Sequence, residues 1–420
     1  MKPQNLEEKI VWYSIIGTYV LYFLGAYYIY VSLIAWLLSF YLIIKICRQQ
    51  TDTQDEEKVN ISLTIWVWII SMLVMEITVI MAHLDFDLGL GKIITTTINW
   101  ARTWAYLALF PLIGCLNIRP QIIYRAVCIL GLQSLIILPI CYLLYTLHFP
   151  HNLYISPLKA IGGNDIAYYT VGLYGFEAET QQTRLKLFAP WAPALGMVAN
   201  IHFILACQET NKKWRLIGAI ASIALIVNSF SRLGMLCLVT VPLITWFLVN
   251  FYKAEVQIFT GIASFIAGIV ATQLINYFQT FKEQFLKARA SSSRVREILG
   301  RIALERWGEA PIWGHGIVET TGPAITAFMP IGTHHTWFSL LFEKGMVGYI
   351  ALVCPLVWSF IALVYKAHKY QLAKICLSML LVIFLYTFGE RIETLTYIYW
   401  PGLVIFGIAL QEQKFFSLKL

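Results

Sequence analysis

The stretch SLTIWVWIISMLVMEITVIMAH, residues 62–83, carries one acidic residue and neither lysine nor arginine. A helix needs about 20 predominantly apolar residues to cross the hydrocarbon core of a bilayer, and this stretch is long enough. The whole chain has the same character, since 59% of its 420 residues are hydrophobic and 13% are charged, far from the soluble average. We therefore predict an all-α fold, in the form of a polytopic membrane protein.

Further apolar runs of similar length occur along the chain, at 92–115, 121–147, 186–207, 256–277, 336–365, 372–388 and 394–411. Two longer runs each have room for two spans. Residues 10–46 can break at Gly25-Ala26, and 214–252 can break at Asn228–Arg232, because polar groups there cannot stay in lipid without partners. Whether 10–46 crosses once or twice is left open by its sequence. The total is about twelve transmembrane helices.

Lysine and arginine in the short loops predict the orientation, because loops on the cytoplasmic side are enriched in them. With the N-terminus inside, one side collects Lys2, Lys9, Lys45, Arg48, Lys58, Arg119, Lys212, Lys213, Arg215, Lys253, Lys366, Lys369, Lys414 and Lys419. That side is predicted to be the cytoplasm, with residues 412–420 as a cytoplasmic tail. The first apolar run lacks a small-residue cleavage site and is expected to be an anchor.

Charge and cysteine usage indicate no further partner or cofactor. The net charge of +8 is explained by cytoplasmic lysines facing anionic lipid headgroups, and nothing in the chain indicates nucleic acid. The eight cysteines lie within or beside apolar runs and form no Cys-x-x-Cys pair, so they predict neither disulfides nor a metal site.

Two segments on the predicted outer side, 148–185 and 278–335, are too long to be simple connectors. The second begins with a helical stretch, 278–290, followed by Ser291–Ser293, which are candidate N-caps for a helix over 294–307. That helix is amphipathic and should lie on the membrane surface or cover a site; its apolar stripe is Val295, Ile298, Leu299 and Ile302. Glycine and proline in 311–316 and 321–324 indicate irregular loop after it.

The long loop ends at His334-His335, at the mouth of an apolar span in the run GTHHTWFSLLFEKGMVG, residues 332–348. Imidazole is the side chain that exchanges a proton near neutrality, so this pair places acid–base chemistry at a membrane boundary. The alternative is that both histidines only reach the interface from a helix end.

Several arginines are predicted to face the same compartment as this pair: Arg184, Arg232, Arg294, Arg296 and Arg391. A single arginine at a helix end often contacts only interfacial phosphates. A set of guanidinium groups around one histidine instead favours a diphosphate site, because the planar fork contacts phosphate oxygens bidentately.

Together these features resemble the O-antigen ligase/polymerase superfamily. The resemblance rests on His334-His335 followed after nine residues by Gly345-Met-Val-Gly348, on the Ser231-Arg232-Leu-Gly turn, and on Arg294 through Pro311-Ile-Trp-Gly-His-Gly. It covers roughly residues 180–411. We accordingly divide the chain into N-terminal membrane helices with a first outer loop, 1–185, and a ligase-like membrane domain, 186–411, that includes the periplasmic loop 278–335.

The resemblance implies a metal-independent, cofactor-free glycosyltransferase of the bacterial inner membrane with its active face in the periplasm. His334 would be the general base and Arg232 catalytic, while Arg184, Arg294, Arg296, Arg391 and His335 would bind substrate. The donor would be a glycan on undecaprenyl diphosphate, the acceptor a glycan or lipid core, and the surroundings membrane lipid. The position after the base is more often Asn, Ser or Gln in that family, so His335 departs from its pattern. Ligase and repeat-unit polymerase share this chemistry.

Parts of the sequence are also compatible with three other functions. His83-Leu-Asp85-Phe-Asp87 could hold a divalent cation for a metal-dependent transferase, although a solvated acidic loop explains it as well. A transporter of lipid-linked sugar would fit twelve helices, but it predicts internal repetition, which the unequal outer loops do not show. A purely structural membrane protein would leave the histidine and arginine set without a role.

Two charges inside predicted spans require partners, because an unpaired one costs about 2.5 to 3.5 kcal/mol in the membrane. Glu76 and Arg102 lie at depths that differ by only about 5 Å if both spans are straight helices. We predict that they form a structural ion pair, with a wall of the donor cavity as the alternative.

Overall fold

The computed structural model describes residues 2–49, 59–163, 165–176, 183–287, 290–319, 321–326, 328–332 and 334–411. The predicted tail 412–420 and Thr333 of the histidine motif lie outside these ranges. The described chain is mostly helical, with four short strands, and this confirms the predicted all-α class.

The N-terminal half begins with seven helices: α1 (Leu6–Ile16), α2 (Thr18–Phe23), α3 (Tyr27–Cys47), α4 (Leu63–Asp85), α5 (Leu90–Ala101), α6 (Tyr106–Ile113) and α7 (Pro120–Thr146). The segment after α7, predicted to be on the outer side, has short elements: β1 (Tyr154–Ile155), α8 (Lys159–Gly162), η1 (Ile166–Tyr168), β2 (Thr170–Val171), β3 (Tyr174–Phe176) and β4 (Thr183–Leu185). β1 pairs with β2 and β3 with β4, both antiparallel. This segment is therefore folded rather than a plain connector.

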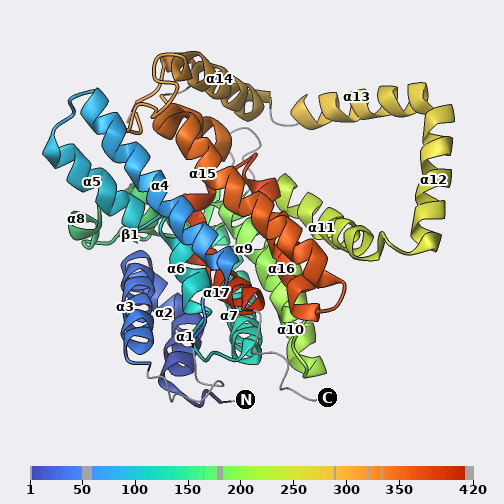
Figure 1. Ribbon diagram of the computed structural model, residues 1–420, viewed down its shortest axis with the longest axis horizontal. Helices are drawn as coiled ribbons and strands as arrows, with labels where there is room; N and C mark the ends of the chain where they lie inside the picture. Colours follow the sequence, from blue (N-terminus) through green and yellow to red (C-terminus); the bar gives the residue numbers. More distant parts are fainter. Residues whose placement is uncertain are drawn as a thin grey trace.

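The second half is helical throughout: α9 (Ala192–Ala206), α10 (Lys212–Asn228), α11 (Arg232–Asn250), α12 (Ala254–Ile269), α13 (Ala271–Lys287), α14 (Ala290–Trp307), η2 (Ala324–Thr326), α15 (Thr336–Ala367), α16 (Gln371–Tyr386) and α17 (Ile392–Leu410). α17 runs through the centre of the bundle and almost all of its side chains are buried. Figure 1 shows α12 and α13 extending away from the bundle and α14 lying across its top.

Six of the described helices are long and apolar enough to cross a membrane: α3, α4, α7, α11, α15 and α17. The bent pair α12–α13 would make a seventh, and α9 and α16 are shorter apolar helices. These spans confirm a multi-pass membrane protein, whereas the full count of twelve remains a prediction.

Both predicted breaks within long apolar runs are confirmed. The chain leaves α2 and enters α3 through Gly25, whose φ of +64° favours glycine and whose added Cβ would lie 2.4 Å from Cβ of Ser156. The second break separates α10 from α11 at residues 229–231. A further break at Gly17, between α1 and α2, was not predicted.

Three predicted elements differ from the structure. Residues 92–115 form two short helices, α5 and α6, instead of one span. The run 256–277 bends by 81° between α12 and α13, because the apolar content of a run does not report whether its axis is straight. Ser291–Ser293 lie inside the first turn of α14, which begins at Ala290, so they are not its N-cap.

The predicted ion pair between Glu76 and Arg102 is wrong. The Thr97 hydroxyl donates to Glu76 Oε1 at 2.5 Å, and the buried ammonium of Lys344 supplies the cationic charge that acts on this carboxylate. Arg102 instead donates to the carbonyl of Gly162. The depth estimate failed because α5 ends at Ala101, so Arg102 stands in a turn rather than on a straight helix.

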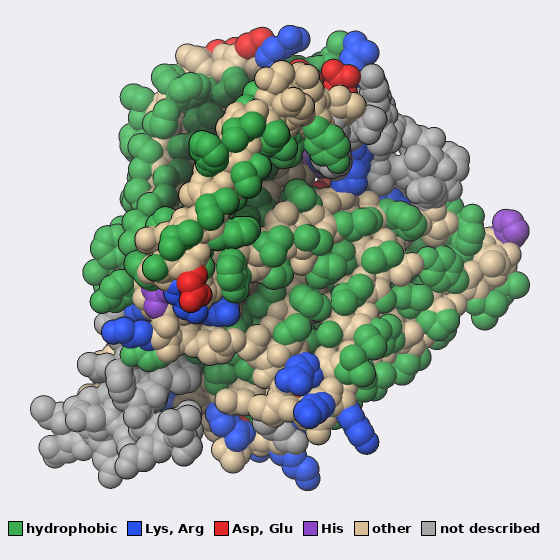
Figure 2. Space-filling view, turned by 90° about the vertical axis from the view of Figure 1, so that its right-hand side faces the viewer, with side chains coloured by type: hydrophobic (Ala, Val, Ile, Leu, Met, Phe, Trp, Pro, Cys, Tyr) green, Lys and Arg blue, Asp and Glu red, His purple; other side chains and the backbone are tan. Residues whose placement is uncertain are grey.

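Lys58, like the tail 412–420, lies outside the described residues; the described loops that were predicted to be cytoplasmic lie toward one face of the bundle (Figure 1). Arg119 Nε lies 2.6 Å from Glu8 Oε1, and His368 Nδ1 lies 2.7 Å from the Val249 carbonyl. The beginnings of α1 and α10 lie at the bottom of Figure 1, opposite α14. In Figure 2 hydrophobic side chains cover the middle of the molecule and Lys and Arg side chains gather toward its lower rim. The bundle thus has two polar faces separated by an apolar zone.

Candidate functional site

The site is organised by a break in α15. Gly345 has φ +61° and ψ −163° and so breaks α15. The short part before it, 336–344, is called the outer segment, and the long part after it, 346–367, the inner segment. The loop 311–316 lies against the break and supplies the backbone hydrogen bonds that the helix loses there. His315 N and Gly316 N donate to Phe342 O and Glu343 O, each at 2.9 Å, while Met346 N and Val347 N donate to Pro311 O and Ile312 O at 2.9 and 3.2 Å. Backbone polar groups at this depth are therefore satisfied on both sides of the break.

Glycine is required where the loop meets the helix. An added Cβ at Gly345 would lie 2.3 Å from Ile312 O, and one at Gly314, which has φ +72°, would lie 2.4 Å from Lys344 N. The two motifs that were separate in the sequence, Pro311–Gly316 and Gly345–Gly348, are thus one structural unit. It sets the direction of the outer segment of α15 and of the histidines that precede it.

His315 belongs to this unit and not to the reactive group. Its Nδ1 lies 3.1 Å from the Phe342 carbonyl and its Nε2 lies 3.1 Å from Glu309 Oε2. The ring stacks on Phe86 and Phe342, with centroids 5.3 and 4.5 Å away. Both nitrogens and both ring faces are occupied, which indicates a structural role.

His334 and His335 differ in their surroundings. His335 is the N-cap of α15: its Nδ1 accepts from Phe338 N at 3.4 Å, and its ring stacks on Phe338 at 4.0 Å. His334 is partly buried with φ +63°, and its ring makes no hydrogen bond to another residue of the described ranges. The geometry leaves the His334 imidazole available to a ligand while His335 holds the helix start.

Both imidazoles are neutral at neutral pH. Burial, followed by the charges of Arg296 and Arg391, lowers the pKa of His334 to about 4. Burial and the charge of Arg296 lower the pKa of His335 to about 4 as well. His334 is consequently in the unprotonated form that a general base requires.

The turn between α16 and α17 fixes the start of α15. Thr336 N donates to Thr387 O at 2.9 Å, and Thr336 Oγ1 donates to Glu390 O at 2.7 Å. Trp337 Nε1 donates to Thr387 Oγ1 at 2.8 Å. Glu390 and Arg391 are thereby held beside the histidine pair, although more than fifty residues separate them along the chain.

Arg391 is engaged by two carboxylates. Its Nη1 and Nη2 lie 3.0 and 3.1 Å from the two oxygens of Glu343, and its Nε lies 2.7 Å from Glu393 Oε1. Burial disfavours the guanidinium, but these carboxylates outweigh that effect and raise the pKa of Arg391. Its charge still acts on His334. Because its N–H groups are already bound to Glu343 and Glu393, Arg391 influences the site through its charge and not by donating hydrogen bonds to a ligand.

Arg184 and Arg232 both lie at the break between α10 and α11. Arg184, on β4, donates from Nε to Ser229 O at 3.1 Å and from Nη2 to Phe230 O at 3.4 Å. Ser231 caps α11 by accepting from Gly234 N at 3.1 Å, which leaves Arg232 as the first helical residue, partly exposed. Arg184 therefore supports the turn that carries Arg232.

α14 packs over the outer segment of α15 through part of its apolar stripe. Buried Leu299 and Ala303 lie on its inner face, and Ala303 packs with Phe342, Ile331 and Phe338. Arg294 and Arg296 stand exposed on α14. Of these two, Arg296 is the one whose charge acts on His334, His335 and Glu390.

Glu390 is a site residue that the sequence analysis did not assign. It is 3% exposed, and its Oε2 accepts from Trp191 Nε1 at 2.9 Å. Burial raises its pKa to about 7, although Arg296, the Trp191 hydrogen bond and Arg184 all favour the charged form. The available signal was its place in the polar interruption Gly389–Glu393 between the last two apolar runs, where only Arg391 was singled out.

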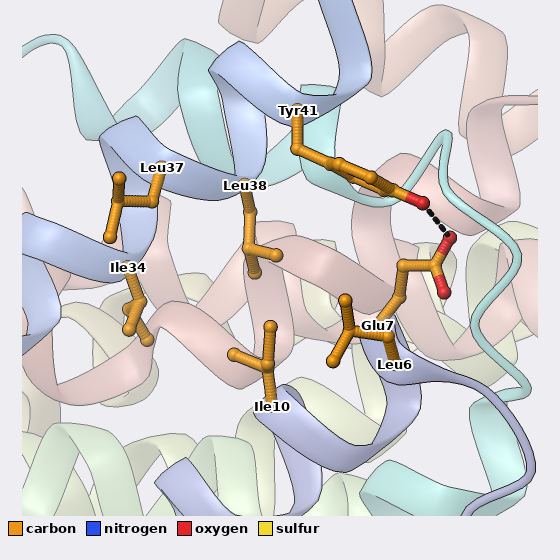
Figure 3. Close-up of a pocket in the computed structure, with 7 residues that line it drawn as sticks. All are labelled: Leu6, Glu7, Ile10, Ile34, Leu37, Leu38 and Tyr41. Carbon is orange, nitrogen blue, oxygen red and sulfur yellow. Dashed lines mark hydrogen bonds between the residues drawn. The ribbon is translucent and has the colours of Figure 1, made fainter. Parts of the chain in front are cut away.

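Other parts of the molecule offer less chemistry. An apolar cavity of about 310 Å³ lies between α1 and α3 on the face opposite the histidines, lined by Leu6, Glu7, Ile10, Ile34, Leu37, Leu38 and Tyr41. Its one carboxylate, on Glu7, already accepts from Tyr41 (Figure 3) and lies 3.5 Å from Lys45 Nζ. In the acidic loop, His83 is buried, with Nδ1 2.7 Å from Val79 O and Nε2 3.3 Å from Thr96 Oγ1. Within the described ranges no three His, Cys, Asp or Glu side chains group as metal ligands.

The chain matches no protein-family model and no curated protein sequence. The resemblance to the O-antigen ligase/polymerase superfamily accordingly stands on the residues quoted for it.

Proposed function

We propose that this protein transfers a glycan from an undecaprenyl-diphosphate donor to an acceptor sugar hydroxyl, as O-antigen ligases do, at the periplasmic face of a bacterial inner membrane. The observation that carries the proposal is the environment of His334. Its imidazole is neutral, unengaged by the described residues, and subject to the charges of Arg296 and Arg391 at one polar face of an apolar bundle.

Acid–base chemistry follows from that environment. His334 removes the proton from the acceptor hydroxyl as its oxygen attacks the anomeric carbon, and the bond from that carbon to the diphosphate oxygen breaks with its electron pair leaving on the diphosphate. The configuration at the carbon is inverted. A base with a pKa of about 4 is weak; burial is the main cause of this low pKa and the charges of Arg296 and Arg391 add to it, so a bound diphosphate, by offsetting those charges, raises it. The donor thus strengthens the base that acts on its own acceptor.

The arginines supply the electrostatic part. Arg232 at the helix mouth and Arg296 on the covering helix bind the diphosphate, whose negative charge grows in the transition state. Arg184 supports the turn that presents Arg232, and Arg391 adds charge while it remains paired with Glu343 and Glu393. Arg294 contributes to attraction of the anionic donor from the rim. The diphosphate lipid is already an activated donor, so no nucleotide is required.

A repeat-unit polymerase of the same superfamily is the alternative enzyme, since it would use the same residues on a different acceptor. Deleting the gene and separating the surface polysaccharide on a gel distinguishes the two. Complete lipid-linked polymer that fails to reach its acceptor indicates a ligase, and accumulation of single-repeat glycan indicates a polymerase.

A transporter of lipid-linked sugar is the second alternative, and the buried charges of Glu76 and Lys344 within spans favour it, because intramembrane charges often line transport pathways. The deciding experiment uses purified protein in lipid nanodiscs with undecaprenyl-diphosphate glycan and acceptor. Release of free undecaprenyl diphosphate together with a glycosylated acceptor supports the enzyme. An intact donor after prolonged incubation would reject it.

A further inference from the structure

Glu390 and Trp191 make a polar and aromatic pair at the site that the proposed chemistry does not use. The indole N–H of Trp191 is the one hydrogen-bond donor to the Glu390 carboxylate within the residues that the structure describes, and it binds Oε2. Oε1 accepts from no described residue, and although the residue is 3% exposed, this oxygen is not among the described side-chain atoms that are both fully buried and unpartnered. Oε1 is therefore an acceptor that a bound ligand can use.

The ligand of this carboxylate is not the diphosphate. Two anions side by side repel each other, and Arg184 and Arg296, whose charges act on Glu390, are the groups that attract phosphate. A neutral ligand with hydroxyl donors avoids the repulsion and can donate a hydrogen bond to Oε1. The carbohydrate part of a lipid-linked glycan has this chemistry, and it lies next to the diphosphate.

Trp191 adds an apolar surface beside the carboxylate. It is partly buried at the N-cap of α9, and its ring lies 6.1 Å from that of Tyr168, centroid to centroid. An indole offers a flat apolar face together with a polar N–H, and here the N–H points to Glu390. One side of a sugar ring is similarly apolar while its edge carries hydroxyls.

We propose that Trp191 and Glu390 form a sugar subsite, in which the carboxylate accepts hydrogen bonds from ring hydroxyls and the indole packs against the ring. This inference rests on the proposed glycan transfer and names which part of the substrate the residues contact. The sugar belongs either to the donor, next to its diphosphate, or to the acceptor.

Ionisation of Glu390 gives the subsite a pH dependence. The groups that act on it are Arg296 from α14, Arg184 from β4, Trp191 from the start of α9 and Tyr386 from α16. Its pKa of about 7 means that the accepting carboxylate is lost as pH falls through neutrality. His334, with a pKa of about 4, stays neutral over that range. The acid limb of kcat/KM should therefore lie near pH 7 in the wild type and move toward pH 4 when Glu390 cannot ionise.

The test measures transfer by Glu390→Gln, which keeps the size of the side chain and an oxygen for Trp191. The matched control is Glu297→Gln, an exposed carboxylate on α14. Loss of a charged hydrogen bond should raise the KM of one substrate by about tenfold or more, with a smaller change in kcat. The substrate whose KM rises identifies the sugar as the donor's or the acceptor's. Unchanged KM values and an unchanged acid limb would overturn the proposal.

Trp191→Phe covers the case in which Glu390→Gln does not fold. It keeps an aromatic face and removes the indole donor, so the KM of the same substrate should rise while the acid limb remains; an unchanged KM would reject the subsite.

A binding experiment tests the subsite independently of glycan transfer. Saturation-transfer NMR measures binding of a water-soluble oligosaccharide released from the host surface polysaccharide. Wild-type protein that transfers nothing yet binds this sugar through Glu390 would refute the transferase and leave the subsite standing.

Discussion

Glu209 and Glu390 are almost equally buried, at 2% and 3% exposure, yet their pKa values shift in opposite directions. Burial alone would raise the pKa of Glu209, but the hydrogen bonds and charge of Arg125 outweigh it and hold this pKa below the usual value. Arg125 binds both oxygens of Glu209, at 3.0 and 2.8 Å, and Asn211 N donates at 2.9 Å. Glu390 has a single neutral donor, Trp191.

The difference separates a structural carboxylate from one available to a ligand. On the face predicted to be cytoplasmic, Glu209 has all the donors that a buried anion needs, and so it fastens the α9–α10 turn to α7. On the opposite face Glu390 and His334 are incompletely satisfied, which is the usual condition of a site awaiting substrate. From burial alone, the pKa values of both carboxylates would be expected to rise by similar amounts.

The largest expected effect comes from the histidine pair. His334→Ala should lower transfer by about 10²- to 10⁴-fold, because it removes the general base. His335→Asn should keep substantial activity, since an amide can still cap α15 by accepting from Phe338 N. Rates of purified variants in nanodiscs measure both, and donor binding should persist in His334→Ala. An active His334→Ala beside an inactive His335→Asn would show that the two roles are exchanged.

The structural carboxylate gives the next effect, on stability and not on chemistry. Arg125→Met leaves Glu209 buried without its ion-pair partner and should destabilise the protein by about 3 to 5 kcal/mol. Thermal unfolding in detergent measures it. Arg301→Met is the control, because the Arg301–Glu305 pair is exposed, with side-chain exposures of 74% and 68%, and should contribute almost nothing. Equal melting temperatures for Arg125→Met and Arg301→Met would show that Glu209 does not depend on its ion pair, contrary to the comparison with Glu390.

Arg232→Lys tests the diphosphate site with the charge retained. Lysine cannot reproduce a bidentate contact with phosphate, so kcat/KM for the donor should fall by about 10- to 100-fold. Arg294→Lys is the comparison on the covering helix, where a smaller loss is expected because that side chain stands at the rim. Full transfer by a well-folded Arg232→Lys protein would make this arginine a membrane anchor only.

The smallest effect on activity, and the most direct test of the two faces, is labelling by a membrane-impermeant maleimide. Single cysteines at Gln49 and Glu297, introduced after exposed Cys47 and Cys354 are replaced, should react from opposite sides of intact spheroplasts, with 297 reacting from outside. Both replacements should leave transfer near the wild-type rate. Equal accessibility would overturn the predicted orientation.

The sequence predicted most of the helix positions, because hydrophobic runs dominate a membrane protein. It also predicted the break at Gly25, where glycine permits a turn, and the break at 229–231, where polar residues interrupt the apolar run. It failed for Arg102, which lies in the turn after α5 and donates to the carbonyl of Gly162, sixty residues away in the sequence. The bend between α12 and α13 could not be predicted either, because an apolar composition does not show whether a helix axis is straight or bent.

The histidines and arginines of the site could be named from residue type and position, but their environments could not. The resemblance assigned His334 and His335 different roles, but only the folded chain shows that His335 caps α15 and that the charge of Arg296, and not that of Arg294, acts on both histidines. Glu390 was missed because its pKa depends on burial and on Trp191, which lies 199 residues earlier. Such long-range contacts leave no local pattern in the sequence.

The loop that closes the break in α15 also bears on biogenesis. Residues 311–316 precede α15 in the chain, so this loop has already been synthesised when the outer segment of α15 enters the membrane. The unpaired backbone groups around Gly345 then find their partners in a segment already made, without waiting for later synthesis. A circular permutant in which the loop follows α15 in the chain would leave those groups unpaired during insertion. We expect quality-control proteases to degrade such a protein faster than the wild type, even if its final fold were the same.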